Sequence, residues 1–264
     1  MSNDSFSMSS APQKIDAKKY PWTTMATIIM VVVGFLVVPL CMQLLLGLVP
    51  QLVLGWGVEH TNVWLKTPVA TFLYVLLSEM VTVGILAAFI ARRKVPFARI
   101  IPLGRPGLRD AGYAISGILT YFALFILVLV VVQQIVPLDQ NQEQALGFDH
   151  GVTGAGLALA FISLVILPPL AEEMLFRGFV YGTLRGQGAS FLVATLSTSV
   201  VFGFLHLFGG KSGELLWIAM IDTFVLSLVL CYVREKTGKL WASIAVHALK
   251  NGFVFLNLFI LGAR

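Results

Sequence analysis

Residues 168–178 read Pro-Pro-Leu-Ala-Glu-Glu-Met-Leu-Phe-Arg-Gly and place three charged side chains in a region that is otherwise mostly apolar. On a helix, Glu173 and Arg177 stand four residues apart with the acid nearer the N-terminus, which is the favourable orientation for an ion pair. Glu172 points to a different face of the same helix. The stretch therefore predicts one glutamate that arginine neutralises locally and a second that is free to act on groups across a helix bundle.

The composition of the whole chain is typical of a polytopic membrane protein. Its 264 residues are 58% hydrophobic and 12% charged, with a mean hydropathy of +0.88, which lies outside the usual balance of a soluble domain. Apolar runs of about 20 residues or more are long enough to cross a bilayer, and they predict an all-α membrane bundle of about seven transmembrane helices. The predicted spans lie near residues 22–48, 66–91, 110–136, 154–185, 189–208, 213–233 and 239–261.

The fourth predicted helix contains two consecutive prolines. Because proline lacks the backbone N–H, we expect this helix to be kinked or broken at Pro168-Pro169, or to begin afresh there. A new helix start would place Glu172 and Glu173 near its positive end, which favours an ionised carboxylate. Glycines follow at every fourth residue and predict a close helix contact; they are Gly178, Gly182 and Gly186.

The basic residues fall in alternate loops. With the N-terminus inside, fourteen Lys and Arg residues lie in inner segments and three in outer ones, which is the positive-inside pattern. This predicts a multi-pass protein of the plasma (bacterial inner) membrane with a cytoplasmic N-terminus and an outside C-terminus, and it removes nucleic acid as a partner. The inner residues are Lys14, Lys18, Lys19, Arg92, Arg93, Lys94, Arg99, Arg105, Arg109, Arg177, Arg185, Arg234, Lys236 and Lys239, and the outer ones are Lys66, Lys211 and Arg264.

The sequence predicts a short tail and one domain. Residues 1–20 are polar and form the cytoplasmic tail, and residues 21–264 form a single membrane-embedded domain, since no large soluble stretch occurs. Cys41 and Cys231 fall near opposite ends of their helices, so a disulfide between them would have to cross the bilayer. They are therefore expected to be free packing residues.

Two histidines lie inside predicted spans, each with a companion one helical turn away. His206 follows Phe202 by four residues and Asn251 follows His247 by four, so each pair shares a helix face. A lone histidine in a membrane is often an interhelical hydrogen-bonding residue. Two histidines, an asparagine and the unpaired Glu172 in the same half of the chain point instead to a shared site.

These residue types fit hydrolysis by an activated water. Glu172 would take a proton from water that His206 orients, while His247 and Asn251 donate hydrogen bonds to the oxyanion that develops on a peptide carbonyl. Alternatively, Glu172, His206 and His247 supply three ligands of a catalytic zinc, with a fourth position open to water. The sequence does not choose between these readings, and it contains no His-Glu-x-x-His motif.

The motifs together resemble those of the CAAX-protease and bacteriocin-processing family, also called the abortive-infection family, which includes the type II CAAX prenyl endopeptidases. The resemblance covers about residues 150–257, the protease-like core. In order, the motifs are Glu172-Glu173-x-x-x-Arg177, Phe202-x-x-x-His206 and His247-x-x-x-Asn251.

The resemblance implies an intramembrane endopeptidase whose substrates are hydrophobic or lipidated peptides or proteins at the bilayer. It implies that Glu172 is the base, that His206 is the water partner, and that His247 acts with Asn251 at the oxyanion. The family is named as metalloprotease, and a glutamate-dependent mechanism without metal is also argued for it, so zinc is left open. The residues expected to organise the site are Glu173, Arg177 and Phe202.

Three further charged residues lie in predicted spans. Glu79 is expected to be a neutral acid hydrogen-bonded to a neighbouring helix, with a proton or ion relay as the alternative. Asp222 and Lys250 fall at similar depth on the sixth and seventh helices, and we expect a buried ion pair that keeps the seventh helix in register. The alternative is that both line one wet cavity without touching.

Two other classes of function fit the same sequence. A proton- or ion-coupled transporter would use Glu79, Glu172 and Asp222 as a relay and the proline pair as a discontinuity in the helix, although the seven spans show no internal repeat. A non-catalytic scaffold would use the cavity to bind a membrane peptide, as an immunity or maturation factor, without cleaving it.

Overall fold

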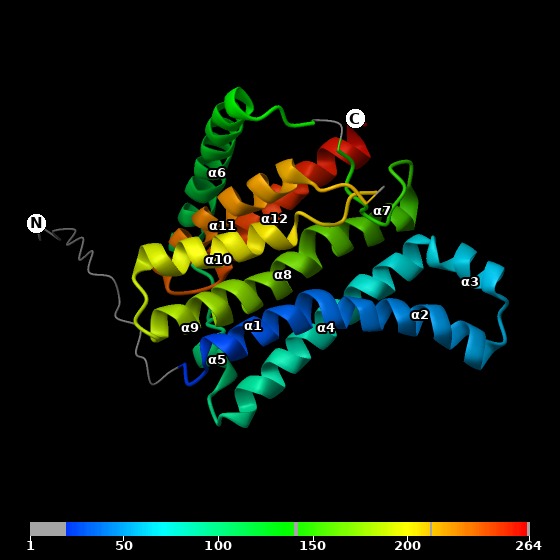
Figure 1. Cartoon of the computed structure of the whole chain (residues 1–264), viewed down its shortest axis with the longest axis horizontal. Helices are drawn as coiled ribbons and strands as arrows, with labels where there is room; N and C mark the ends of the chain where they lie inside the picture. The colour runs from blue at the N-terminus through cyan, green and yellow to red at the C-terminus, as the bar shows by residue number, and fades with distance from the viewer. Residues whose placement is uncertain (1–19, 140–141, 212, 263–264) are drawn as a thin grey trace, which may run out of the picture.

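The computed structural model describes residues 20–139, 142–211 and 213–262, and these pack as a bundle of helices (Figure 1). Among these described residues, six helices are long and apolar enough to cross a membrane, which confirms the predicted polytopic helical fold. Within the described ranges, Cys41 and Cys231 are both free, as expected. The predicted tail except Tyr20 lies outside the described residues, as do Lys14, Lys18, Lys19 and Arg264.

The first half of the chain contains three of the long helices. Thr23 and Thr67 accept hydrogen bonds from backbone N–H groups at two helix starts, which satisfies donors that a helix leaves free at its beginning. Gly55 ends the first long helix in the left-handed region, at φ 68°, a conformation that glycine adopts without steric cost. In order, the helices are α1 (Thr24–Val32), π-helical η2 (Val33–Val37), α2 (Val38–Leu54), α3 (Val58–Leu65), α4 (Pro68–Arg92), α5 (Phe97–Ile100) and α6 (Leu108–Ile135).

The second half of the chain carries the three motifs. Its first part is one uninterrupted helical run, Gly154–Gly186, which includes two π-helical segments. In order, the helices are α7 (Gly154–Phe161), η3 (Ile162–Ile166), α8 (Leu167–Glu173), η4 (Met174–Val180), α9 (Tyr181–Gly186), α10 (Phe191–Leu205), α11 (Trp217–Thr237), α12 (Trp241–Phe255) and η5 (Leu256–Ile260).

The interruption predicted at the proline pair takes the form of a distortion, not of a new helix. Pro168 and Pro169 stand in the first turn of α8, directly after the π-helical segment η3. A π-helical turn spaces backbone hydrogen bonds differently from an α-helix, and π-helical turns and prolines are both common sites of helix distortion. The chain therefore passes the prolines without a break.

The fifth predicted span is shorter in the structure than in the prediction. It was expected over residues 189–208, and α10 covers Phe191–Leu205, 15 residues, or about 22 Å of rise. His206 follows as the C-terminal cap, and the chain turns at Gly209, which has a φ of 119°. The helix therefore ends before the length of about 20 residues that a full span requires.

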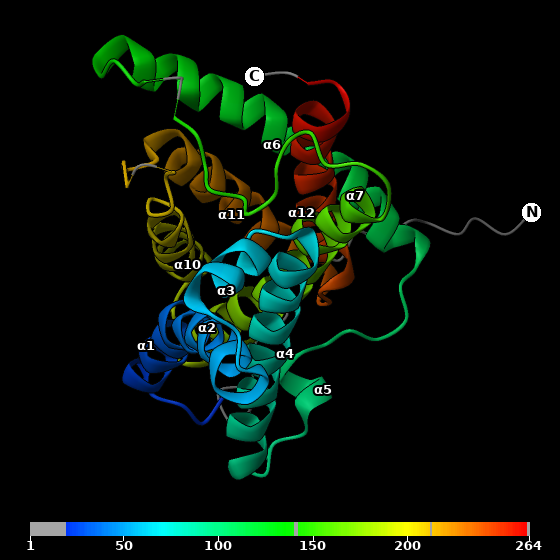
Figure 2. The same cartoon turned by 90° about the vertical axis from the view of Figure 1, so that its right-hand side faces the viewer.

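The helix that carries the glutamates lies between the two halves of the bundle. In Figure 1, α8 runs between α1, α2 and α4 on one side and α10, α11 and α12 on the other, and it packs against both α4 and α12. The second half of α6 extends away from the other helices (Figure 2), and its apolar side chains there are exposed, as lipid-facing residues would be. The central position of α8 brings Glu172 and Glu173 within reach of both sides.

The spacing of the glycines predicted a close contact with another helix. The groups nearest to this face of the central helix are instead two residues outside helices. A Cβ atom added at Gly182 or Gly186 would lie 2.5 to 2.7 Å from the ring of Tyr20, and one at Gly178 would lie 2.5 Å from the side chain of Ile101. Gly182 and Gly186 need glycine because the Tyr20 ring presses against the backbone there, whereas Gly178 meets the flexible end of the Ile101 side chain. The close contact was predicted correctly, and its partner was not.

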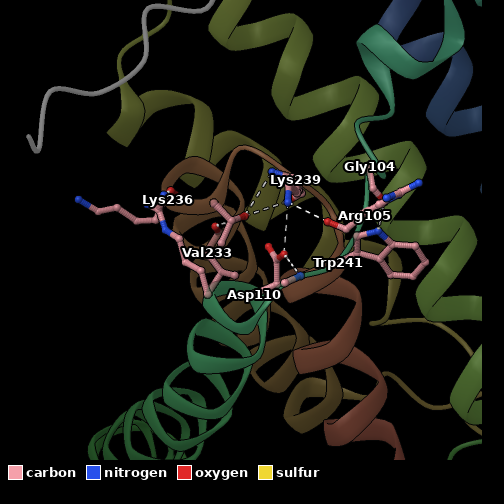
Figure 3. Close-up of polar contacts among 10 residues, drawn as sticks. Gly104, Arg105, Asp110, Val233, Lys236, Lys239 and Trp241 are labelled. Carbon is pink, nitrogen blue, oxygen red and sulfur yellow. Dashed lines mark hydrogen bonds and ion pairs between the residues drawn. The ribbon is translucent and has the colours of Figure 1, made fainter.

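One end of the bundle is held by contacts between the loop after α5 and the start of α12 (Figure 3). The indole N–H of Trp241 donates to the carbonyl of Gly104 at 2.8 Å, and Lys239 donates to the carbonyl of Arg105 at 2.9 Å. The Lys239 ammonium also lies 3.5 Å from the Asp110 carboxylate at the start of α6. These contacts fix α6 and α12 relative to each other at the end where the basic loops gather.

Candidate active site

The Glu173–Arg177 pair predicted from spacing is present and is fully buried. Arg177 Nη1 lies 3.0 Å from Glu173 Oε1, and neither side chain has exposed surface. The guanidinium also stands over the ring of Phe202, 4.5 Å from the ring centre. A buried ion pair costs desolvation energy that its attraction offsets only with good geometry, so such a pair fixes positions and adds little net stability.

His247 lies between the two glutamates. Its Nδ1 is 3.1 Å from Glu173 Oε1, and its Nε2 is 3.8 Å from Glu172 Oε2. Since an ionised Glu173 accepts hydrogen bonds, it holds the proton of a neutral imidazole on Nδ1 and leaves a lone pair on Nε2. Glu173, itself fixed by Arg177, therefore sets both the orientation and the tautomer of a ring that faces Glu172.

His206 is held by the helix that precedes it. Its Nδ1 lies 2.8 Å from the carbonyl oxygen of Phe202, an arrangement in which Nδ1–H donates and Nε2 remains an acceptor. The Phe202 ring is fully buried and lies 4.7 Å from the ring of His206 and 5.9 Å from that of His247, measured between centroids. Phe202 thus contacts Arg177 and both histidines, and it gathers the motif residues around one aromatic ring.

Asn251 contacts the backbone of the helix that carries the glutamates. Its side-chain amide donates to the carbonyl of Leu164 at 3.0 Å. In an α-helix this carbonyl would accept from residue 168, and proline there has no N–H. Asn251 therefore satisfies a carbonyl that Pro168 leaves free, and one N–H of its amide remains for another acceptor.

Glu172 lines a cavity of about 70 Å³ whose other walls come from the first half of the chain. Its Oε2 atom is buried and has no hydrogen-bond partner within the described residues. The cavity is lined by Gly34, Phe35, Pro39, Ser78, Glu79, Thr82, Ala171, Glu172 and Leu175.

Glu79 lines this cavity, although the sequence favoured a structural role for it, with a proton or ion relay as the alternative. Its span carries no motif of the resemblance, and a single acid there was expected to be structural. The available signal was the acid itself, because a charged residue in a membrane span by default marks a functional site. Gly34 is a second such residue: a Cβ atom there would lie 3.0 Å from Thr82 and 3.1 Å from Leu175, so glycine allows the first helix to form the cavity wall.

The residues considered as zinc ligands do not form a metal centre in this arrangement. Throughout the described parts of the chain, no three His, Cys, Asp or Glu side chains lie close enough together to hold a metal ion. His247 turns one nitrogen to each glutamate, and His206 turns Nδ1 to a backbone carbonyl. The donor set expected for zinc is therefore not assembled.

The predicted ion pair between the sixth and seventh helices is confirmed. Lys250 Nζ lies 2.6 Å from Asp222 Oδ2, with side-chain exposures of 12% and 17%. The hydroxyl of Tyr121 on α6 donates to the other carboxylate oxygen, so three helices meet at Asp222. Both of its oxygens are engaged, which does not favour a role for Asp222 as a mobile proton relay.

Replacing Asp222 with asparagine is expected to lower the free energy of unfolding in detergent by about 1–3 kcal/mol, because it leaves the Lys250 ammonium without its charged partner. Thermal unfolding of the purified variant measures the loss. The double variant Asp222→Asn/Lys250→Met should recover part of it, since it removes both charges. Unchanged stability of the single variant would show that the pair does not hold α12 in register.

The comparisons with known proteins match the part of the chain that carries the motifs. Residues 154–253 match the family model of type II CAAX prenyl endopeptidase Rce1-like proteins. Over 98 residues, 37% of this chain, it is 32% identical to the Bacillus subtilis (strain 168) protein named "Putative membrane peptidase YdiL", of which 36% is covered. Over 173 residues, 65% of this chain, it is 30% identical to "Uncharacterized protein YyaK" of the same organism, of which 54% is covered.

These matches span about a third to a half of the length of the curated relatives, and no solved structure matches the chain. The matched family is the one that the motifs indicated. Residues 154–253, which carry Glu172, His206, His247 and Asn251, are therefore similar to the type II CAAX prenyl endopeptidase Rce1-like family.

Proposed function

We propose that this chain is an intramembrane endopeptidase that hydrolyses peptide bonds of membrane-associated or lipidated peptides. The family of residues 154–253 supports a CAAX-type protease in the membrane. The observation that carries the proposal for this chain is the position of Glu172. Its carboxylate lies at the wall of a cavity, where the Oε2 atom is 3.8 Å from Nε2 of His247 and is buried without a hydrogen-bond partner among the described residues.

In the proposed reaction, Glu172 acts as general base and takes a proton from the attacking water. A base for this step must be within reach of the water and unoccupied by a cation, and Arg177 is engaged by Glu173 instead. His206 acts as the water partner, because its Nδ1 is held by Phe202 and its Nε2 is left to accept a hydrogen bond from water.

The oxyanion of the tetrahedral intermediate is assigned to His247 and Asn251. His247 donates from Nε2 once that atom has received from Glu172 the proton taken from water, and Glu173 at Nδ1 stabilises the resulting imidazolium. Asn251 offers the N–H that is not used by Leu164. Donors that are held in place before the reaction stabilise the developing charge without reorganisation.

The six long apolar helices and the family match support an integral multi-pass membrane protein. We place it in the plasma membrane with the N-terminus in the cytoplasm and the C-terminus outside, because the basic residues gather in the segments that this orientation puts inside. The substrate is then a hydrophobic or lipidated peptide that reaches the cavity from the bilayer.

The proposal is tested by mixing the purified full chain with a small panel of hydrophobic and prenylated peptides and measuring cleavage by mass spectrometry. We expect wild-type protein to cleave at least one peptide, with and without a chelator, and Glu172→Ala to cleave none. Loss of wild-type cleavage on chelation would replace this mechanism with a metal-dependent one. A wild type that binds peptides without cleaving them would favour the scaffold.

A further inference from the structure

Glu79 on α4 faces the same cavity as Glu172 on α8. The two acids come from different halves of the chain, and the motifs of the family match include neither Glu79 nor any other residue of α4. The cavity has a volume of about 70 Å³, which is enough for roughly two water molecules. The cavity is therefore lined by two carboxyl groups, and the proposed reaction uses only that of Glu172.

The lining of the cavity indicates a polar occupant. Ser78 lies beside Glu79 on α4, is 7% exposed, and its hydroxyl has no hydrogen-bond partner among the described residues. The buried Oε2 atom of Glu172 is likewise without such a partner. Since buried polar groups in proteins almost always find partners, a cavity lined by two unpartnered ones fits water or the polar atoms of a peptide bond.

The Arg and Lys side chains near the cavity are paired with other acids. Arg177 pairs with Glu173, and Lys250 pairs with Asp222. Within residues 20–139, 142–211 and 213–262, no Lys or Arg forms an ion pair with Glu79 or Glu172. Two carboxylates that share one site in low dielectric do not both ionise, because like charges repel there with little screening. One proton is therefore held between them.

We propose that Glu79 is a further catalytic residue, which holds this proton and delivers it to the leaving amine. The inference rests on the proposed function. Ionised Glu172 takes a proton from water, and the water oxygen forms a bond to the carbonyl carbon while the C=O π electrons move to oxygen. The C–N bond then breaks, and its nitrogen takes the proton of Glu79. The products are a carboxylic acid and an amine, and return of the water proton from His247 through Glu172 to Glu79 restores the starting state.

The division of roles between the acids follows from their surroundings. Glu172 faces the Nε2 atom of His247 at 3.8 Å, so hydrogen-bond donors lie on its side of the cavity once His247 is protonated. Ser78 lies beside Glu79, and the titratable neighbour of Glu79 on the same helix is Tyr74. From the elements that pack on α4, the titratable group facing it is Glu172, with Glu173 and Arg177 behind that residue as a neutral pair.

The test compares Glu79→Gln with wild type in the peptide-cleavage assay over a range of pH. Glutamine keeps the shape and hydrogen bonding of a protonated glutamate but does not release a proton as an acid. We expect kcat to fall about 100-fold with KM unchanged, and the decline of wild-type kcat toward alkaline pH to disappear. Glu79→Asp should restore part of the rate. The matched control is Glu59→Gln, which changes an exposed acid on α3 and should leave kcat unaltered.

An infrared measurement tests the shared proton without using activity. The C=O stretch of a protonated carboxylic acid should be present in wild type at neutral pH and weaker in Glu79→Gln. Wild-type cleavage with equal kcat in Glu79→Gln overturns the role of Glu79 and leaves the proposed function standing. A wild type that cleaves no peptide overturns both. An infrared band that Glu79→Gln does not change overturns the shared proton even where kcat falls.

Discussion

Replacing Arg177 with methionine is expected to lower the free energy of unfolding in detergent by about 3–5 kcal/mol. The variant leaves the Glu173 carboxylate in a site with no exposed surface and without its cation. It also removes the guanidinium from the face of the Phe202 ring, 4.5 Å away. Methionine is similar in length and apolar, so the loss reports the charge more than the packing. Chemical or thermal unfolding of the purified variant measures it.

Two further variants make this expectation specific. Arg93→Met changes an exposed arginine at the end of α4 and should shift stability by no more than about 0.5 kcal/mol. The double variant Glu173→Gln/Arg177→Met removes both charges and should be more stable than Arg177→Met alone. Wild-type stability in Arg177→Met would mean that His247 or another group neutralises Glu173 without the arginine.

The contacts that the sequence predicts are those that helix geometry largely determines. Glu173 and Arg177 meet because residues four apart on any helix are neighbours. Asp222 and Lys250 meet because they lie at the same depth on adjacent helices of the bundle. The predicted span boundaries were therefore sufficient to predict this pair. Because a membrane span fixes the depth of each of its residues in the bilayer, such a pair between two helices can be predicted without a structure.

The contacts that sequence did not predict depend on which helix faces which. That Glu173 also holds His247 needs the rotation of α12 against α8, and that Glu79 faces Glu172 needs the packing of α4 on α8. Tyr20 occupies the glycine face although it belongs to no helix. The spacing of residues fixes which side chains share a face, and it does not fix the partner of that face.

The proline pair illustrates how local and tertiary structure combine. The missing N–H of Pro168 predicts a kinked or broken helix, or a fresh helix start, because the helix alone offers no substitute donor. In the structure the donor comes from Asn251 on α12, so a residue assigned to chemistry also completes the backbone of the helix that carries the base. This contact ties α12 to the central helix one helical turn from His247.

Replacing Glu172 with glutamine should lower kcat for peptide cleavage by a factor of about 100 to 10,000, because it removes the general base. The same change at Glu173, one residue along the chain, should act on the fold as well. Glu173→Gln leaves the fully buried Arg177 without its anion and no longer holds the His247 proton on Nδ1. The variant should therefore lose stability as well as activity. Kinetics and unfolding measured on both variants separate the two roles.

Glu172→Gln should fold at least as stably as wild type. Glu172 has a buried oxygen without a partner within the described residues and shares its cavity with a second acid, so the native carboxylate is held at a cost that an uncharged amide of the same shape avoids. Residues kept for catalysis often lower stability in this way. Stability lost in Glu172→Gln as in Glu173→Gln would show that both acids hold the fold. The site would then contain no spare base, because a carboxylate that the structure needs for its own charge balance is not free to take a proton from water.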